Sequence, residues 1–313
     1  MAEQTATTGA AGRTFKIGYL ASLDDTPAGG ATTPRFSDIR ALAQAAETAG
    51  LDSFWVADHF IARMPDEQEV GQWESFTFLS ALAAVTTRIQ LGPMVAATSF
   101  RNPALTAKMA DSLDEISNGR FILGIGAGWH EPEYTAFGYP FDHLASRFEE
   151  SLQIIVPLLH EGAVTFQGDY YAADNAVLRP RGPSRNGPPI LIGARRPRML
   201  RLVARYADAW NTAWHTQPAV VAERWAEMRR ACEEEGRDPA TLKLTAGAIL
   251  RLGPDGQPAQ GEPYQLTGTN EEIAERLRGF IAVGVQHVIL VIEPEGMVGF
   301  ERFQPILALL NQG

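Results

Sequence analysis

The chain has 313 residues, of which 45% are hydrophobic, and a formal net charge of -10 at pH 7. No apolar run approaches the ~18 residues that span a bilayer, which favours a soluble globular protein over a membrane protein. The negative charge argues against a nucleic-acid partner, because such partners are bound through basic surfaces. The single cysteine, Cys232, excludes an intrachain disulfide and fits a reducing cytoplasm.

The N-terminal residues 1–13 are rich in small residues and contain no apolar segment of a signal peptide. We expect a disordered tail there. Residues 14–313 are expected to form a single domain.

Short apolar segments alternate with amphipathic ones through this domain. Strands are expected at Lys16–Leu20, Ser53–Ala57, Ile89–Ala96, Phe121–Gly126, Pro189–Gly193, Ala209–Thr212, Leu242–Leu250 and His287–Ile292. Helices are expected at Ser37–Ala49, Trp73–Thr87, Pro103–Asn118, Asp142–His160, Pro197–Tyr206, Pro218–Glu235, Thr269–Val283 and Phe300–Leu310. Asn102 before Pro103 and the capping box Thr269–Glu272 mark two helix starts. Eight alternating strand and helix units predict an α/β fold, a parallel sheet closed into a (β/α)8 TIM barrel.

An insertion at about residues 161–189 separates the fourth strand from the fifth. Val164–Tyr171 alternates around Gly168 and Asp169, which predicts a small hairpin. An open doubly wound sheet is the alternative architecture. The first strand is not followed by Gly-x-Gly-x-x-Gly, which argues against a dinucleotide-binding fold.

Glycines occupy alternate positions at the end of the fourth strand, at Gly124, Gly126 and Gly128. We interpret them as removing side chains where something flat lies against the backbone. The alternative is a tight turn with a solvated loop behind it. Trp129 and Glu133 follow in the expected loop, at the strand end where barrels hold their ligands.

The residues that follow the barrel strands should share one face of the barrel. They are Asp58 and His59; Met94, Val95 and Ala96; Gly128, Trp129, His130 and Glu133; Gly193, Ala194, Arg195 and Arg196; Asn211, Trp214 and His215; and Glu293 and Glu295. His59 is the candidate general acid or base, because its ordinary pKa lies near neutrality. Asp58 could orient it, although adjacent strand residues point to opposite sides; the alternative is a structural histidine at the barrel rim.

The loop Gly193–Arg196 precedes the helix that begins at Pro197, and free backbone N–H groups with the helix dipole favour a phosphate there. Residues 175–207 contain no Asp or Glu but eight arginines, Arg179, Arg181, Arg185, Arg195, Arg196, Arg198, Arg201 and Arg205. This segregation predicts a local field that attracts anions. The alternative is a solvated, arginine-rich helix face.

The sequence contains neither the motifs of a metal site nor that of a serine nucleophile. The six histidines form no His-x-His or His-x-x-x-His pair, so no metal site is expected. The nucleophile elbow Gly-x-Ser-x-Gly is also missing from the sequence.

Four segments of the sequence resemble the luciferase-like monooxygenase superfamily, and most closely its branch that uses the deazaflavin coenzyme F420. They are Leu51–Phe60; Ile89–Lys108, with Phe-Arg-Asn-Pro-Ala at 100–104; Gly119–Pro140; and Pro188–Asn211, with Ala-Arg-Tyr-Ala-Asp-Ala-Trp-Asn at 204–211. The resemblance extends from about Phe15 to Leu310 and implies a TIM barrel with an insertion.

The resemblance also implies roles for the strand-end residues. Asp58 and His59 would lie beside the reactive ring of the cofactor, with Glu133 retained as a further catalytic residue. Met94 and Val95 would form the bulge of the third strand, with a non-prolyl cis peptide against the back of the ring, and Ala96 beside them would also bind the cofactor. Gly128 and Trp129 would contact the ring or ribityl chain, and Gly193–Arg196 the phosphate. Trp129 stands where some deazaflavin enzymes have a catalytic Glu.

The expected function is hydride transfer between F420 and a small organic substrate. The first alternative is a two-component monooxygenase that uses FMN, O2 and a partner flavin reductase. The second is a barrel that binds a flavin without turnover. We expect a cytoplasmic protein, and the resemblance implies a homodimer.

Overall fold

The computed structural model describes residues 13–25, 33–63 and 69–312. Most of the expected tail lies outside these residues. Its last residue, Arg13, is 4% exposed. Its guanidinium contacts the carboxylate of Asp52 at 2.7 Å and donates to the backbone oxygen of Gly50, so the folded domain includes Arg13.

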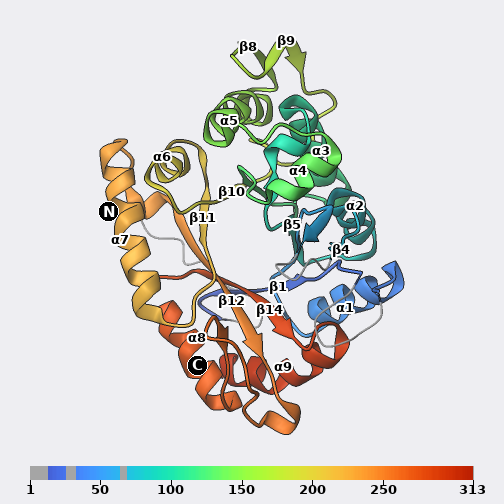
Figure 1. Ribbon diagram of the computed structural model, residues 1–313, viewed down its shortest axis with the longest axis vertical. Helices are drawn as coiled ribbons and strands as arrows, with labels where there is room; N and C mark the ends of the chain where they lie inside the picture. The colour runs from blue at the N-terminus through green and yellow to red at the C-terminus, as the bar shows by residue number, and fades with distance from the viewer. Residues whose placement is uncertain (1–12, 26–32, 64–68, 313) are drawn as a thin grey trace.

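Within the described residues, eight parallel strands form a closed barrel (Figure 1). They are β1 (Lys16–Ala21), β2 (Ser53–Val56), β5 (Gln90–Pro93), β7 (Leu123–Gly126), β10 (Ile190–Gly193), β11 (Ala209–Thr212), β12 (Lys243–Arg251) and β14 (His287–Glu293). They pair in the order β5-β2-β1-β14-β12-β11-β10-β7. A parallel bridge between Leu91 and Phe121 joins β5 to the chain entering β7 and closes the ring. The TIM-barrel prediction is confirmed.

Helices surround the barrel and cover its apolar outer face. They are α1 (Phe36–Thr48), α2 (Ser75–Val85), α3 (Pro103–Ser117), α5 (Leu144–Glu161), α6 (Pro197–Tyr206), α7 (Pro218–Glu234), α8 (Asn270–Ala282) and α9 (Met297–Leu310). Asn102 caps α3 and the capping box at Thr269 starts α8, as predicted. The helices expected to begin at Ser37 and Asp142 begin elsewhere, because their N-cap residues are Arg35 and His143.

Several elements were not predicted. A hairpin of β3 (Ile61–Arg63) and β4 (Glu69–Gly71) follows β2, and β13 (Gln265–Leu266) pairs with β12. The expected loop after β7 contains α4 (Glu131–Phe137), with Pro132 in its first turn and a left-handed Gly138 at its end. Both residues are ordinary helix boundary signals. Seven residues are too few to display a helical hydrophobic period, so the pattern alone did not reveal the helix.

The insertion contains the predicted hairpin, formed by β8 (Ala163–Gln167) and β9 (Ala172–Val177). The hairpin projects from the barrel next to α5 (Figure 1). The carboxylate of Glu150 on α5 accepts backbone N–H groups of Asp169, Tyr170 and Tyr171 at 2.8 to 2.9 Å. Side-chain contact with α5 therefore fixes the turn.

The third barrel strand is interrupted rather than continuous to Ala96. It ends at Pro93 and resumes as β6 (Ala96–Ala97), which pairs with β7. The alternate glycines of β7 make room for this interruption. A methyl group on Gly124 would collide with the Pro93 carbonyl oxygen, and one on Gly126 would lie 2.9 Å from a Val95 methyl. One on Gly128 would collide with the Tyr134 hydroxyl. The interpretation that these glycines make room for a flat ligand is wrong at Gly124, where protein atoms fill the space, whereas Gly126 and Gly128 also line a cavity.

The substitution Gly124→Ala should therefore destabilise the fold. Because the colliding atom belongs to the backbone, relief requires the barrel strands to move apart, and overpacking of this kind costs about 1–3 kcal/mol. The matched control is Gly193→Ala, whose added methyl would lie 3.5 Å from the Val95 methyls, an ordinary contact. Urea unfolding compares the two variants. Equal midpoints would show that β5 and β7 are not this tightly packed.

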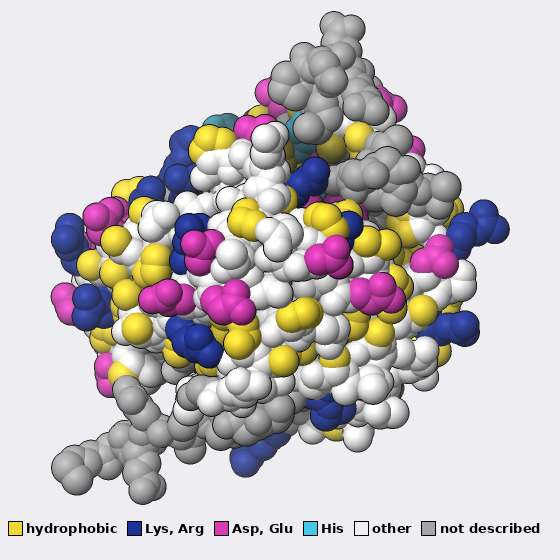
Figure 2. All heavy atoms as spheres, turned by 90° about the horizontal axis from the view of Figure 1, so that it is seen from below, with side chains coloured by type: hydrophobic (Ala, Val, Ile, Leu, Met, Phe, Trp, Pro, Cys, Tyr) yellow, Lys and Arg dark blue, Asp and Glu magenta, His cyan; other side chains and the backbone are white. Residues whose placement is uncertain are grey.

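Two further observations concern membrane-spanning helices and surface charge. No helix in the described ranges is long and apolar enough to cross a membrane. On the face in Figure 2, acidic and basic side chains are interspersed with hydrophobic ones, so this face carries no continuous basic patch.

Candidate functional site

A cavity of about 630 Å³ opens at the carboxyl ends of the barrel strands. Its lining includes nearly all of the site residues predicted from the sequence: Asp58, His59, Met94, Val95, Gly128, Trp129, Glu133, Gly193, Ala194, Arg195 and Arg196. Ala96 is the exception, since it is 1% exposed and packs in the hydrophobic core. Its neighbour Ala97 lines the cavity instead.

Further strand-end residues were named from the sequence but were not among these predicted site residues. Some of them line the cavity and others do not. Asn211 and Trp214 line the cavity, whereas His130, His215, Glu293 and Glu295 are not part of its lining. Leu20 and Met199 line it without having been predicted. Met199 lies in the first turn of α6. Its place at the cavity depends on how α6 packs against the barrel, which the sequence pattern does not reveal.

His59 is held by Glu133. Its Nδ1 lies 2.8 Å from Oε1 of Glu133, and the other carboxylate oxygen accepts the Phe60 backbone N–H at 3.0 Å. Glu133 is 1% exposed and comes from the first turn of α4. Among the described residues Nε2 of His59 has no hydrogen-bond partner, and the ring lines the cavity. The unpredicted helix α4 thus orients the candidate acid.

The pKa of His59 is raised above its ordinary value. Burial alone lowers this pKa, but the hydrogen bond and charge of Glu133, with the charges of Asp58 and Asp24, outweigh burial. The imidazolium form therefore persists to higher pH than in a free imidazole, and in that form His59 can donate a proton into the cavity.

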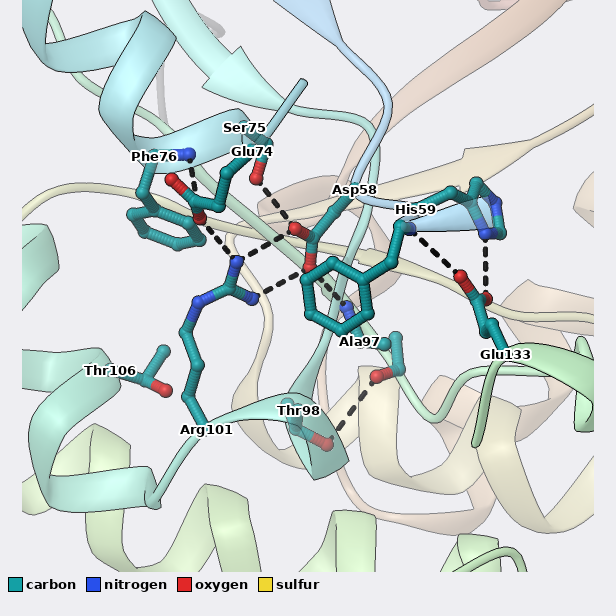
Figure 3. A network of polar contacts seen from close by, with 12 residues as sticks. Asp58, His59, Glu74, Ser75, Phe76, Ala97, Thr98, Arg101, Thr106 and Glu133 are labelled. Carbon is teal, nitrogen blue, oxygen red and sulfur yellow. Dashed lines mark hydrogen bonds and ion pairs between the residues drawn. The ribbon is translucent and has the colours of Figure 1, made fainter. Parts of the chain in front are cut away.

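Asp58 turns away from His59 (Figure 3). Its two oxygens accept from the Arg101 guanidinium at 2.8 Å each. They also accept the Ser75 hydroxyl at 2.6 Å and the Ala97 N–H at 3.1 Å. Asp58 is 2% exposed, so this is a buried network. The expectation that Asp58 orients His59 is wrong; it joins β2 to the segments that lead into α2 and α3.

Of this network only Asp58 was predicted as part of the site, and Arg101 is its central unpredicted residue. It also contacts Glu74 at 2.6 Å and lies over the Phe76 ring, 4.5 Å from its centroid. Burial lowers the pKa of Arg101, but its bonds to Asp58 and Glu74 raise the net value. The sequence signals were its place in the motif Phe-Arg-Asn-Pro-Ala at 100–104 and beside the Asn102–Pro103 helix start, and neither indicates an acidic partner.

Two cis peptide bonds lie at the cavity. The bond Met94–Val95 is cis, as the resemblance implied, and Ala213–Trp214 is a second that was not predicted. Both segments line the cavity. Trp129 is 71% exposed and Trp214 is 42% exposed, so both indoles offer apolar surface to a ligand or substrate.

The predicted field of eight arginines is wrong in extent. Only Arg195 and Arg196 line the cavity. The other arginines of α6 pair with acidic residues of neighbouring helices: Arg198 with Glu149, Arg201 with Glu235, and Arg205 with both. In the insertion, Arg181 contacts Asp111 of α3 at 3.6 Å. The positive charge at the cavity is therefore confined to the loop before α6.

This loop keeps the features of an anion site. The N-cap residue Arg196 gives no side-chain hydrogen bond to the first turn of α6. The N–H groups of that turn are therefore open to an acceptor from outside the helix, and the helix dipole favours a negative one.

The remaining histidines and acids form no further site. His215 shares a hydrogen bond of 2.8 Å with the Thr212 hydroxyl, and burial lowers its pKa. Across residues 13–25, 33–63 and 69–312, no group of three His, Cys, Asp or Glu side chains is arranged to hold a metal ion.

Comparison with known proteins agrees with this geometry. A family model described as luciferase-like monooxygenase matches residues 15–263. A phthiodiolone/phenolphthiodiolone dimycocerosates ketoreductase of Mycobacterium tuberculosis is 32% identical over 223 residues, 66% of this chain and 58% of that protein. The pyrimidine monooxygenase RutA of Escherichia coli is 36% identical over 207 residues, 64% of this chain and 55% of that protein. The chain thus spans less than two thirds of the length of these relatives.

Solved structures share the fold at lower identity. An F420-dependent secondary alcohol dehydrogenase in complex with an F420-acetone adduct superposes with a TM-score of 0.78 at 20% identity, covering 95% of this chain and 99% of that one. EDTA monooxygenase from Chelativorans sp. BNC1 gives 0.79 at 14%, covering 96% and 94%. Since the family model covers most of the sequence, the chain belongs to the luciferase-like monooxygenase family.

Proposed function

We propose that this protein is an oxidoreductase that moves a hydride between coenzyme F420 and a small organic substrate. The observation that carries the proposal is the His59–Glu133 pair on the cavity wall. Adding a hydride to a carbonyl carbon leaves charge on its oxygen, and a protonated side chain within reach supplies the missing proton. When bound, the cofactor supplies the hydride chemistry, and the protein binds and orients the reactants.

The residues of the cavity fit a flavin-like group with a phosphate. Arg195 and Arg196 lie beside the open N-terminus of α6, which suits a phosphate. The Val95 side chain reaches between β7 and β10 toward Gly126 and Gly193, and gives the cavity a narrow apolar wall. A flat ring is the shape that such a wall accommodates best.

His59 and Glu133 have separate tasks in this proposal. Glu133 holds Nδ1, which fixes the imidazole and raises its pKa, and Nε2 of the protonated imidazole donates to the substrate oxygen. Trp129, Trp214 and Met199 cover the cavity with apolar surface and limit access of water to the transfer.

The alternative is an FMN-dependent monooxygenase that works with O2 and a reductase. One observation favours it: only two of the eight arginines line the cavity, and two suffice for a single phosphate. One relative is named a pyrimidine monooxygenase, which is in keeping with monooxygenase chemistry. A barrel that binds flavin without turnover is the third possibility.

A binding titration separates these functions. We expect F420 to quench the intrinsic fluorescence of the purified protein with micromolar affinity, and FMN to bind at least about tenfold more weakly, because it lacks the additional carboxylates that Arg195 or Arg196 can bind. The double variant Arg195→Ala/Arg196→Ala should weaken F420 binding, whereas Arg229→Ala, on α7, should not. Preference for FMN would instead support the monooxygenase, and binding of neither would contradict both.

The assembly and compartment belong to the same proposal. We place the protein in the cytoplasm as a homodimer, with a flavin reductase as a further partner only in the FMN case. Sedimentation of the purified protein tests the homodimer directly, and a monomer at micromolar concentration would contradict it.

A further inference from the structure

The side chain of Asn211 is a polar group inside the barrel, at the cavity. Its neighbour Trp210 faces outward, where it donates to the Ala194 oxygen and stacks on Trp225 of α7. Successive residues of a strand point to opposite faces, so Asn211 points inward. It is 7% exposed and lines the cavity. An amide inside a barrel costs free energy unless its polar atoms are bonded, so each atom of this amide needs a partner.

One half of the amide is bonded to Thr245 on the neighbouring strand. Nδ2 of Asn211 lies 2.9 Å from the Thr245 hydroxyl oxygen, and that hydroxyl lies 3.1 Å from the Trp210 carbonyl oxygen. A carbonyl oxygen only accepts, so the single hydroxyl proton of Thr245 is donated to Trp210. The hydroxyl oxygen can then only accept from Asn211. This chain of bonds fixes the orientation of the amide, with its NH₂ toward Thr245.

The oxygen of the amide, Oδ1, remains available to a ligand in the cavity. No residue in the described part of the chain donates a hydrogen bond to Oδ1 of Asn211, and Oδ1 is not among the buried unpartnered atoms. It is therefore accessible, and the accessible space beside Asn211 is the cavity. A ligand that fills the cavity removes water from this oxygen and must offer it a donor, or the oxygen loses its hydrogen bond.

The surroundings of Asn211 suit a flat ring with an N–H on its edge. Directly opposite on β10 is Gly193, which has no side chain to cover the amide. The Val95 methyls lie 3.5 Å from where a methyl on Gly193 would be, so Val95 supplies apolar surface on the same cavity as Asn211. Arg196 is three residues beyond Gly193, a chain length of at most about 10 Å. That span matches a ribityl chain between a ring near Asn211 and a phosphate near α6.

We infer that Oδ1 of Asn211 accepts the imide N3–H of the ring of a bound flavin or deazaflavin. This inference rests on the proposed function, in that it takes the cavity to hold such a ring. FMN and F420 share this N–H, so Asn211 recognises the ring class and does not distinguish the two cofactors. Thr245 is a positioning residue, because it holds the amide without reaching the ligand.

Methylation of the ring nitrogen tests the contact. The probes are FMN and 3-methyl-FMN, together with the F420 ring and ribityl fragment and its 3-methyl derivative, each titrated by fluorescence. The wild-type protein should bind the unmethylated member of a pair roughly tenfold more tightly, because methylation removes the donor. In Asn211→Ala the affinity for the unmethylated ligand should fall by the same factor. The preference for the unmethylated over the methylated ligand should then vanish.

Further variants make the result specific. Asn211→Asp keeps an acceptor at the same place and should retain the preference. Met199→Leu changes another cavity-lining side chain without removing a polar atom, and should also retain it. Thermal unfolding monitored by circular dichroism confirms that each variant is folded.

The outcomes separate the two proposals. If the wild type binds the rings but shows no preference for the unmethylated form, or if Asn211→Ala keeps the preference, the role of Asn211 is wrong and the proposed function stands. If the wild type binds neither ring system, the proposed function is wrong and the assignment of Asn211 is overturned with it.

Discussion

The substitution His59→Ala is expected to reduce turnover about 10²–10⁴-fold while cofactor affinity changes little. A positioned general acid contributes a rate factor of that size, and removing the imidazole leaves solvent as the proton source. Because the ring contacts Glu133 through Nδ1 and lines the cavity through its remaining edge, its loss leaves the arginine loop and the cavity floor in place. Steady-state kinetics combined with a fluorescence titration of the cofactor measures both quantities.

The variant Glu133→Gln provides the matched control for this prediction. The amide removes the charge that raises the pKa of His59, so this pKa should fall. The protonated form is the active acid, and the rate of the wild type should decline as pH rises through the raised pKa. In Glu133→Gln the decline should begin at lower pH. A profile that does not move, or full turnover in His59→Ala, would exclude His59 as the proton donor.

The same pKa shift links folding to pH. His59 has a higher pKa in the folded than in the unfolded protein, so it contributes stability that is fully present below the unfolded value near 6.5. That contribution is lost as pH rises through the folded pKa. The stability difference between wild type and His59→Ala should therefore shrink across that interval.

The barrel was predictable because its signals are local. Short apolar strands alternate with helices, and Asn102 and Thr269 mark helix starts by their own hydrogen bonds. The carboxyl ends of parallel strands meet at one face, which placed His59 and Gly193 at the same cavity before any contact was known.

The errors arise where the answer depends on distant residues. The glycines of β7 are required because Pro93 and Val95 of the neighbouring strand pack against them. The sequence of β7 alone contains no information about this packing. Arg198 and Arg205 are neutralised by Glu149 of α5 and by Glu235 beyond α7. Counting charges along the chain detects the cluster of arginines but not the acidic residues that pair with them. The count therefore overestimates the positive electrostatic field at the cavity.

The position of Asp58 shows the same limit at the candidate site. Sequence order puts it next to His59, and the resemblance implied that it lies beside the cofactor ring. In the segment that follows β2 the two side chains point in different directions, so the neighbour in sequence is the partner of Arg101 instead (Figure 3). The true partner of His59 is 74 residues away, at the start of α4.

Asp58→Ala is expected to cost the protein about 3–5 kcal/mol of unfolding free energy, because it leaves a buried guanidinium without its main counter-charge. The Arg101 side chain is 10% exposed and keeps only Glu74 as an acidic partner. The Ser75 hydroxyl and the Ala97 N–H lose their acceptor at the same time. Urea unfolding at constant pH measures the change through the transition midpoint at unchanged slope.

Glu227→Ala is the matched control, since it removes a carboxylate from the exposed Arg224–Glu227 pair on α7. The stability of that variant should stay within about 0.5 kcal/mol of the wild type. The comparison also decides between the two roles given to Asp58. A structural role lowers stability and leaves turnover per folded molecule nearly unchanged at a temperature where the variant is native. Wild-type stability with a large loss of turnover would instead place Asp58 in contact with the reacting groups, as the resemblance implied.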